Sequence, residues 1–569
     1  MKYNVYHSLL LLLSIAAQAQ SPFVPLNPDY YHWVDRMEIR QGRWAEGFHS
    51  SMKPYNRQGI VRLTDSVEAN LRYPLSRTDF FNLRYLRDDS WEWVTDKDSA
   101  NRNTITRVFP GDSQRPFLGT FYQKKADFYS VQTPDFDLHV NPVFYYSTGT
   151  ESNNNNRLFV NTRGVEVRGS IAKRLGFYSF FSDNQAVFPR YIQEYGQLYG
   201  IPDGGFAPGE GFAKQYRQTG ADFLSARGYI TFNILKIINF QFGHDRNFIG
   251  NGYRSLFLSD NSAPYLFMKL TTTFGRFQYT NLFSELQNTS VRRTSQNDPI
   301  TQKFTSIHHL SMNLGDNINL GLFEAEVFSR DRFDINYLNP IIFYRYVESF
   351  RGSADNAMIG IDFKANFRRH FLVYSQFLID EFLISELSAG RGSWTNKFAA
   401  QAGVKYIDAL GVPNLDLQAE MNLARPYTYS HKSGQTNYVH YSQPLAHPLG
   451  ANFVEGLGIV RYQHRQFNGV GTFGIMMYGT DQPYRNYGGD ITKNYETRVR
   501  NDGNYIGQGR QTAVTYADLR LSYMFKHNVF LEGRYLFRFQ DSQYTPLAYT
   551  TQQGSVALRW NLPYRGWTF

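Results

Sequence analysis

The most constraining feature of this sequence is an alternation of apolar and polar residues that recurs in segment after segment from residue 137 to the C-terminus. Residues 356–367 read NAMIGIDFKANF, where isoleucine and phenylalanine alternate with Asp362 and Lys364. Successive side chains of a β-strand point to opposite faces, so each such segment has one apolar face and one largely polar face. The sequence therefore predicts many strands that are apolar on one side only.

Short and long connections alternate between these segments. We expect tight joins at 173–174, 235–236, 275, 316, 368–369, 410–413, 465–466 and 526–528. We expect long joins near 147–157, 186–222, 247–263, 289–302, 330–355, 385–397, 426–451, 480–512 and 540–553. Bacterial outer-membrane barrels have short periplasmic turns and long external loops, whereas soluble sandwiches and propellers have no reason to keep such parity.

The pattern therefore predicts an all-β transmembrane protein, an antiparallel outer-membrane β-barrel over residues 137–569 with about 18 strands, an even number as such barrels require. We expect the strands to start near residues 137, 158, 176, 223, 238, 264, 276, 303, 318, 356, 370, 398, 414, 452, 467, 513, 529 and 555. The last strand is expected to direct Val556, Leu558, Trp560 and Leu562 outward.

The charged residues of the strands indicate which face is the lumen. An Arg or Lys at the lipid-facing midplane costs about 2–4 kcal/mol, so the charged sets are expected to point inward. The expected lumen charges are Asp362, Lys364, Arg520, Glu532, Arg534 and Arg538. Leu531→Arg should then reduce assembled barrel in a heat-modifiability gel, whereas Arg534→Leu should be mild.

Composition agrees with this interpretation and excludes some classes of function. Aromatic residues make up 17% of the chain, which suits the two aromatic girdles of a barrel, although a soluble all-β protein would also allow it. The net charge of +10 comes from scattered residues rather than a Lys/Arg block, so we expect a cationic lumen or an acidic surface polymer and no nucleic acid. The absence of Cys excludes disulfides and thiolate metal sites.

The N-terminal residues indicate export. Lys2, an apolar run from Leu9 to Leu13 and Ala17-Gln18-Ala19 have the order of a signal peptide, predicted as residues 1–19. Residues 20–131 are expected to form a periplasmic helical appendage that plugs or docks on the barrel. Asn27-Pro28 begins one helix, Ser76 to Asp79 resembles a capping box, and Gly119 to Val131 is assigned to the appendage.

No catalytic constellation stands out, and we expect no enzyme, no cofactor and no metal. The glycines from Gly243 to Gly252 lack the Lys-Ser/Thr of a phosphate loop. His308 and His309 are adjacent on a strand and so point to opposite faces, which argues against joint metal binding. Glu324 and Glu326 share a face and are interpreted as lumen charges rather than a catalytic pair.

One hairpin resembles a known family. Its connection reads GHDRNFIGNGYRSLFLSDNSAPY and is similar to the outer-membrane capsule-assembly family named Wzi, with weaker similarity in 337–349, 356–382 and 444–453. The residues that carry the motif are Gly250, Gly252, Ser255, Leu256, Ser259, Asn261 and Pro264. The chain departs from the family by having Ala263, not Arg, before the proline, and it is also similar to RemB-like gliding-associated proteins. The resemblance implies an 18-stranded barrel with a periplasmic helical bundle that holds capsular polysaccharide at the cell surface.

Tyrosine-rich external loops are the best candidates for glycan binding. Aromatic faces stack on sugar rings, amides bind hydroxyl groups, and Arg or Lys pairs with acidic groups. The candidates are Arg391, Trp394, Tyr427, Tyr429, Tyr438, Tyr441, Tyr484, Tyr487, Tyr495 and Tyr505, with Arg498 and Arg500 nearby. The alternative is that these tyrosines pack together and cap the barrel.

The leading hypothesis is a non-catalytic outer-membrane barrel that binds or assembles surface polysaccharide through its external loops. A component of a gliding or secretion machine is the second hypothesis, and a diffusion pore is the third. The expected partners are outer-membrane lipid, surface polysaccharide and, for the second hypothesis, proteins of a surface machine.

Overall fold

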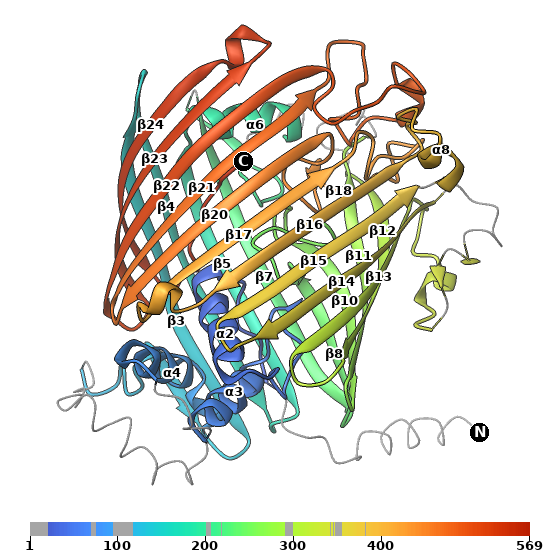
Figure 1. Cartoon of the computed structure of the whole chain (residues 1–569). Coiled ribbons are helices and arrows are strands. Elements are labelled where there is room, and N and C mark those ends of the chain that lie inside the picture. The colour runs from blue at the N-terminus through green and yellow to red at the C-terminus, as the bar shows by residue number, and fades with distance from the viewer. Residues whose placement is uncertain are drawn as a thin grey trace.

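Eighteen antiparallel strands close into a barrel in the computed structural model (Figure 1). The structure describes residues 21–69, 75–94, 118–200, 206–217, 219–290, 300–341, 343–344, 346–347, 355–381 and 383–569; the expected signal segment lies outside them. The barrel strands are β3 (Phe136–Glu151), β4 (Asn154–Ile171), β5 (Leu175–Val187), β7 (Gly220–Leu235), β8 (Ile238–Asp245), β10 (Tyr265–Phe274), β11 (Phe277–Asn288), β12 (Thr301–Asn313), β13 (Ile318–Phe328), β14 (Asn356–Phe367), β15 (Phe371–Glu381), β16 (Lys397–Tyr406), β17 (Leu415–Ala424), β20 (Phe453–His464), β21 (Phe467–Thr480), β22 (Arg510–Lys526), β23 (Val529–Ser542) and β24 (Tyr549–Trp560). β24 pairs with β3 and closes the cylinder.

The predicted fold class and strand number are confirmed, and two expected connections are corrected. The join expected near 147–157 is a tight hairpin at Ser152 and Asn153, because β3 and β4 continue through the polar residues that suggested a loop. The last strand begins at Tyr549 rather than near 555, and it ends at Trp560. Leu562, expected to point outward on that strand, is buried inside the barrel instead.

The two faces of the wall follow the expected alternation. Leu531 and Val556 are 57% and 59% exposed on the outer face, whereas Glu532 and Arg559 are buried on the inner face and pair at 2.7 Å. Aromatic pairs such as Phe274–Phe277 and Phe371–Tyr406 ring the end that carries the short turns. In bacterial outer-membrane barrels this end faces the periplasm.

The N-terminal helices close the short-turn end. They are α2 (Pro28–Gln41), α3 (Arg57–Ala69) and α4 (Arg77–Asp89), followed by the short helix η2 (Trp91–Trp93). Asn27 caps α2, and Ser76 with Asp79 forms the capping box of α4, as the sequence indicates. The three helices share an apolar core, and α2 extends upward into the lumen (Figure 1). Among the described residues, no helix has the length and apolar character needed to cross a membrane.

Salt bridges fix α2 to the barrel wall. Arg36 lies 2.9 Å from Asp79 of α4 and 2.6 Å from both Asp408 and Asp416 at the short-turn end of the barrel. The end of the segment 119–131, expected in the appendage, forms β2 (Tyr129–Gln132), which pairs with the start of β3. The appendage and the barrel are therefore joined both by charge pairs and by a β-ladder.

The interior of the barrel is filled by inward-folded segments. The connection 246–264 between β8 and β10 was expected as an external loop, but it descends into the lumen, where β9 (Phe248–Ile249) pairs with β1 (Met52–Lys53). Residues 561–569 also lie inside the barrel, where the Phe569 ring is 3.9 Å from that of Tyr195 on α6 (Arg190–Tyr199). We call the segment 246–264 the inner plug.

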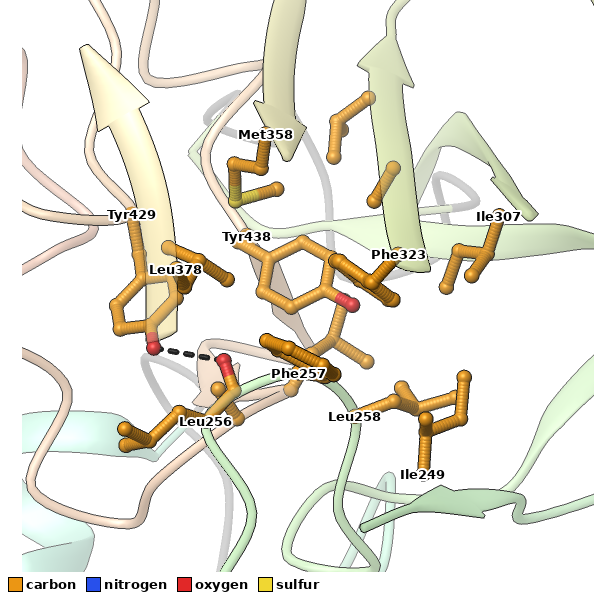
Figure 2. Packing of buried hydrophobic residues seen from close by; sticks show 14 of the residues in the cluster. Ile249, Leu256, Phe257, Leu258, Ile307, Phe323, Met358, Leu378, Tyr429 and Tyr438 are labelled. Atoms are coloured by element: carbon orange, nitrogen blue, oxygen red, sulfur yellow. Dashed lines mark hydrogen bonds between the residues drawn. The ribbon is translucent and has the colours of Figure 1, made fainter. Parts of the chain in front are cut away.

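An apolar cluster anchors the inner plug to the wall (Figure 2). Leu256, Phe257 and Leu258 are fully buried, and the Phe257 ring stacks on Phe323 of β13 at 4.4 Å. The connection 425–452, which contains β18 (Val439–His440) and β19 (Gln443–Pro444), covers this cluster from the long-loop end. The lumen is thus partly an ordinary hydrophobic core.

The outer face of the wall carries polar residues, and not only apolar ones, on β12 and β13. Glu324 and Glu326 lie on the same face of β13 as Leu322, which is 51% exposed, so they point outward and not into the lumen as expected from sequence. His309 points inward and binds Asp362 at 2.7 Å, whereas His308 points outward and lies 3.7 Å from Glu324. The two histidines therefore face opposite sides, as predicted.

The connection after β13 covers this polar sector. We call residues 329–347, apart from 342 and 345, the outer strap; it includes the short helix η4 (Ile335–Leu338) and lies beside the outside of the wall (Figure 1). The Tyr344 ring packs 4.0 Å from that of His308, and the carbonyl of Pro340 accepts hydrogen bonds from Tyr279 and Asn281 of β11. The outer strap thus places a second layer of protein against β11–β13.

Candidate functional site

Two external loops interlock at the long-loop end of the barrel. The first follows β15, contains α8 (Ile384–Ser388) and continues to residue 396, and the second is residues 481–509 between β21 and β22. Backbone hydrogen bonds join them: Gly503 donates to Arg391, Asn504 to Gly392, and Trp394 to Asn501, at 2.7–2.9 Å. The loops form one preformed surface.

Trp394 lies at the centre of this surface. The Arg498 guanidinium lies 4.1 Å from the Trp394 ring centroid, and the Tyr495 ring packs against the Trp394 ring at 4.8 Å. Arg498 also donates to Asn501 at 2.8 Å. Stacking on an aromatic face and a hydrogen bond to an amide hold a guanidinium in a fixed orientation. Trp394 therefore positions Arg498 and also offers its own partly exposed ring.

The two interlocked loops also carry exposed groups. Tyr505 is 60% exposed and lies 5.5 Å from the Arg500 guanidinium, and Tyr484 is fully exposed. Arg391 is exposed and pairs with Glu386 at 2.9 Å, and this carboxylate raises the pKa of Arg391. We call Arg391, Trp394, Arg498, Arg500 and Tyr505 the loop patch. It combines aromatic faces with cationic donors, and nearby carboxylates supply acceptors.

Four of the candidate tyrosines face the protein interior. Tyr427, Tyr429, Tyr438 and Tyr495 are at most 4% exposed. Tyr427 donates to the carbonyl of Asn486, and Tyr429 donates to that of Leu256 in the inner plug at 2.8 Å. Their rings present no free face to a sugar in this structure. These four follow the alternative interpretation, in which tyrosines pack together and cap the barrel.

Tyr441 and Tyr487 are half-buried. The Tyr441 ring packs on His440 at 4.7 Å, and the backbone amide of Tyr487 donates to Asp481 at 2.7 Å. Burial raises the pKa of Asp481, although Lys493 at 2.9 Å opposes the change. Among the ten sequence candidates, Arg391, Tyr484 and Tyr505 are exposed, and Trp394 is partly exposed like Tyr441 and Tyr487.

The family-motif residues lie inside the barrel, in the inner plug. The Ser255 hydroxyl donates to the carbonyl of Ile249, and the Leu256 amide donates to Gln376 of β15 at 2.9 Å. Gly250 and Gly252 lie so near the wall that an added Cβ would approach Gln376 and Glu420 to 2.9 and 2.6 Å. These residues position the inner plug.

The rest of the motif meets the connection 425–452. The Ser259 hydroxyl donates to the carbonyl of Ala446, and Asn261 donates to that of Pro444 at 3.1 Å. The carbonyl of Pro264 lies 3.1 Å from the His440 ring nitrogen. The motif therefore ties two inward-folded connections together and does not contribute to the external surface.

The six expected lumen charges lie inside the barrel, where two of them contact the N-terminal segment and four contact other residues of the barrel strands. Arg520 pairs with Asp29 of α2 at 2.6 Å, and Lys364 hydrogen-bonds Ser50 while lying 4.3 Å from the Trp44 ring. The other four also have partners: Asp362 binds His309, Glu532 binds Arg559, Arg534 binds Asp518 and Arg538 binds Gln540. Arg520 and Lys364 therefore attach the N-terminal segment to the lumen, whereas the other four charges pair with groups on the wall itself.

Comparisons with known proteins identify the architecture. No protein-family model matches the chain, and no curated protein matches it. Among solved structures, the chain is similar to Wzi of Escherichia coli, described as an outer-membrane protein involved in group 1 capsule assembly and as a carbohydrate-binding β-barrel. That similarity has a TM-score of 0.56 at 10% identity and covers 95% of this chain and 100% of the other.

Two further solved structures are more distant. OprD of Pseudomonas aeruginosa has a TM-score of 0.41 at 7% identity and covers 75% of this chain and 96% of the other. OccAB1 of Acinetobacter baumannii has a TM-score of 0.40 at 9% identity and covers 74% and 96%. The similarity to Wzi supports the fold of an outer-membrane β-barrel with N-terminal helices.

Proposed function

We propose that the protein is a Wzi-like outer-membrane barrel that binds surface polysaccharide at the loop patch without catalysis. The observation that carries the proposal is the preformed Trp394–Arg498 pair, held by backbone bonds between two loops and flanked by exposed Tyr505 and Arg391. Rigid aromatic and guanidinium groups bind sugars at little cost in conformational entropy. Wzi itself is described as carbohydrate-binding, and the proposal extends that property to this chain.

The filled lumen argues for a binding protein over a pore. The inner plug, α2 and residues 561–569 occupy the interior, and the apolar cluster around Phe257 fills its sector of the lumen among the described residues. Porins of comparable strand number keep an aqueous channel. In planar bilayers we expect the purified protein to show far lower conductance than an open porin; steady porin-like conductance would contradict this.

The binding proposal can be tested with purified full-length protein and a panel of acidic and neutral capsular polysaccharides. We expect Tyr505→Ala to weaken binding by about 2- to 12-fold, the equivalent of one aromatic contact of about 0.5–1.5 kcal/mol. Trp394→Ala should weaken binding by more than about 10-fold, because it also releases Arg498. Cells that produce Trp394→Ala should retain less stained polysaccharide.

Tyr544→Ala is the matched control. Tyr544 precedes the short helix η7 (Thr545–Leu547) in another external loop, is 41% exposed and lies 4.4 Å from the Arg510 guanidinium. It therefore offers the same chemistry outside the loop patch. Equal losses in Tyr544→Ala and Tyr505→Ala, or no loss in Trp394→Ala, would count against the proposed surface.

A further inference from the structure

A cavity of about 260 Å³ lies in the lumen between α2, the inner plug and the C-terminal residues. A water molecule occupies about 30 Å³ of liquid volume, so the cavity has room for a molecule of several non-hydrogen atoms. Eight Lys or Arg residues and five Asp or Glu residues line it. None of the residues of the loop patch belongs to this lining.

The positive charges of the cavity exceed its negative charges after the ion pairs are counted. Arg254 pairs with Glu455, Lys405 with Asp35, and Arg520 with Asp29, while Asp518 pairs with Arg534 outside the lining. In the part of the chain that the structure describes, the other five cations form no ion pair within 4 Å: Lys53, Arg227, Arg246, Arg461 and Arg565. The carboxylates left without an ion pair there are Glu210 and Asp260.

Three of these cations come from three different segments and meet near one carboxylate. Arg227 belongs to β7, Arg246 to the inner plug and Arg565 to the C-terminal residues. Burial lowers the pKa of Arg565 to about 10; Glu210 opposes this change, while the like charges of Arg227 and Arg246 add to it. The guanidinium groups of Arg227 and Arg246 are therefore both near enough to Arg565 to repel it.

Donors within this cluster also lack acceptors. Arg227 is 9% exposed, its guanidinium lies 4.2 Å from the Phe180 ring, and its Nε has no hydrogen-bond partner. One Nη of Arg565 is buried without a partner, and the other reaches Asn184 only at 3.4 Å. A buried charge without a partner is costly, and guanidinium groups match the oxygens of carboxylates and phosphates in pairs.

We propose that this cavity is a binding site for a small oxyanion, held by Arg227, Arg246 and Arg565. The shared ligand chemistry is a carboxylate or phosphate group, from a sugar acid or from free phosphate. Tyr253 and Trp567 also line the cavity and suit the ring of a sugar acid. The site is independent of the loop patch, so either can fail without the other.

The test uses the full-length protein in detergent at constant ionic strength. Sodium glucuronate, inorganic phosphate and glucose are titrated separately by calorimetry, with the shift in Tm as a second readout. We expect saturable binding of glucuronate, phosphate or both, and none of glucose. Preference for glucuronate would indicate a sugar acid, and preference for phosphate would indicate free phosphate.

Variants connect binding to the named residues. Arg227→Gln and Arg565→Gln should each weaken binding by at least 10-fold. Glu210→Gln removes the nearby carboxylate and should strengthen binding several-fold, a gain that misfolding cannot mimic. Arg157→Gln, at an exposed arginine that hydrogen-bonds Thr148 on the outside of the barrel, should change nothing. Absence of saturable binding by every probe, or binding indifferent to Arg227, Arg565 and Glu210, would overturn the proposal.

Discussion

At the scale of single residues, the interior packing explains a glycine of the inner plug. The backbone amides of Tyr253 and Arg254 donate to Glu420 of β17 at 2.6 and 3.0 Å, which draws the chain against the wall at Gly252. A Cβ at Gly252 would lie 2.6 Å from the same carboxylate. Gly252, which in the sequence resembles an ordinary loop glycine, is therefore required for close contact between the inner plug and the barrel.

Phe257 gives a residue-scale prediction. Its ring is fully buried against Phe323, so Phe257→Ala should destabilise the folded barrel by about 3–5 kcal/mol, the usual cost of deleting a buried Phe side chain. The measurement is the temperature of the folded-to-unfolded mobility shift in a heat-modifiability gel, which should fall. Leu521→Ala, at a side chain 72% exposed on the outer wall, is the control and should cause a smaller change.

Sequence reasoning could not separate exposed from buried tyrosines in the loops. Tyr438 and Tyr505 both stand among Asn, Gln and Gly, yet one is fully buried and the other is 60% exposed. Their environment is decided by contacts with segments far away in sequence, such as the inner plug. The run Leu256-Phe257-Leu258 inside a polar connection is a signal of burial that can be seen in the sequence alone.

At the scale of elements, strands are predictable where the membrane imposes alternation and not where it does not. β8, β13, β14, β21 and β23 begin where expected. β24 begins at Tyr549, earlier than predicted. Its first five residues read YTTQQ and have no apolar face, so the alternation pattern does not mark them as part of the strand. β4 likewise extends through Asn154 to Asn156. Strands that rise above the hydrocarbon need only ladder hydrogen bonds, so hydropathy does not reveal them.

Leu531 and Arg534 on β23 give the element-scale prediction. Leu531 faces lipid near the short-turn end of β23, so Leu531→Arg should reduce assembled barrel, at a cost below the about 2–4 kcal/mol of an Arg at the bilayer midplane. The sequence predicts a mild effect for Arg534→Leu, but the structure pairs Arg534 with Asp518 through two hydrogen bonds of 2.7 and 2.9 Å. We now expect a measurable loss, because the substitution leaves Asp518 without its partner.

The double variant Arg534→Leu/Asp518→Leu distinguishes two effects of Arg534→Leu: placing an apolar side chain in the lumen, and removing the ion-pair partner of Asp518. It removes both charges from the lumen and should recover much of the folded fraction that Arg534→Leu loses, whereas nothing on the lumen side should rescue Leu531→Arg. The assay is again heat-modifiability. A double variant no better folded than Arg534→Leu would show that the pair is not the reason for the loss.

At the scale of the whole molecule, docking of α2 depends on buried charge pairs. Asp29 and Asp35 pair with Arg520 and Lys405 of the wall at 2.6 and 2.5 Å. Burial favours the neutral carboxylates, but these cations outweigh it, so the pKa values of Asp29 and Asp35 lie below their ordinary value. Their contribution to stability is present above the unfolded pKa of about 3.9 and is lost as pH falls through the lowered folded pKa.

We therefore expect α2 to stay docked from neutral pH down to about pH 4 and to loosen below it. Glu38 of α2 has the opposite effect, because burial raises its pKa and its protonation at low pH therefore favours the docked helix. The measurement is the fluorescence of a variant in which Trp33, buried on α2, is the only tryptophan, followed from pH 7 to pH 2.5 beside far-UV circular dichroism for the strands. Emission from Trp33 that stays constant to pH 2.5 would contradict a charge-dependent docking.

The outer strap bears on how such a chain enters a membrane. Without the outer strap, the outward-facing polar side chains of Asn281, His308 and Glu324 would contact acyl chains. The strap replaces them at the lipid-facing surface with Ile341 and Phe343, which are 86% and 76% exposed. Insertion of this polar part of the wall into a bilayer is unfavourable until the outer strap covers it. We therefore expect the outer strap to pack against β11–β13 before this part of the wall enters the membrane, so that the strap is required for insertion.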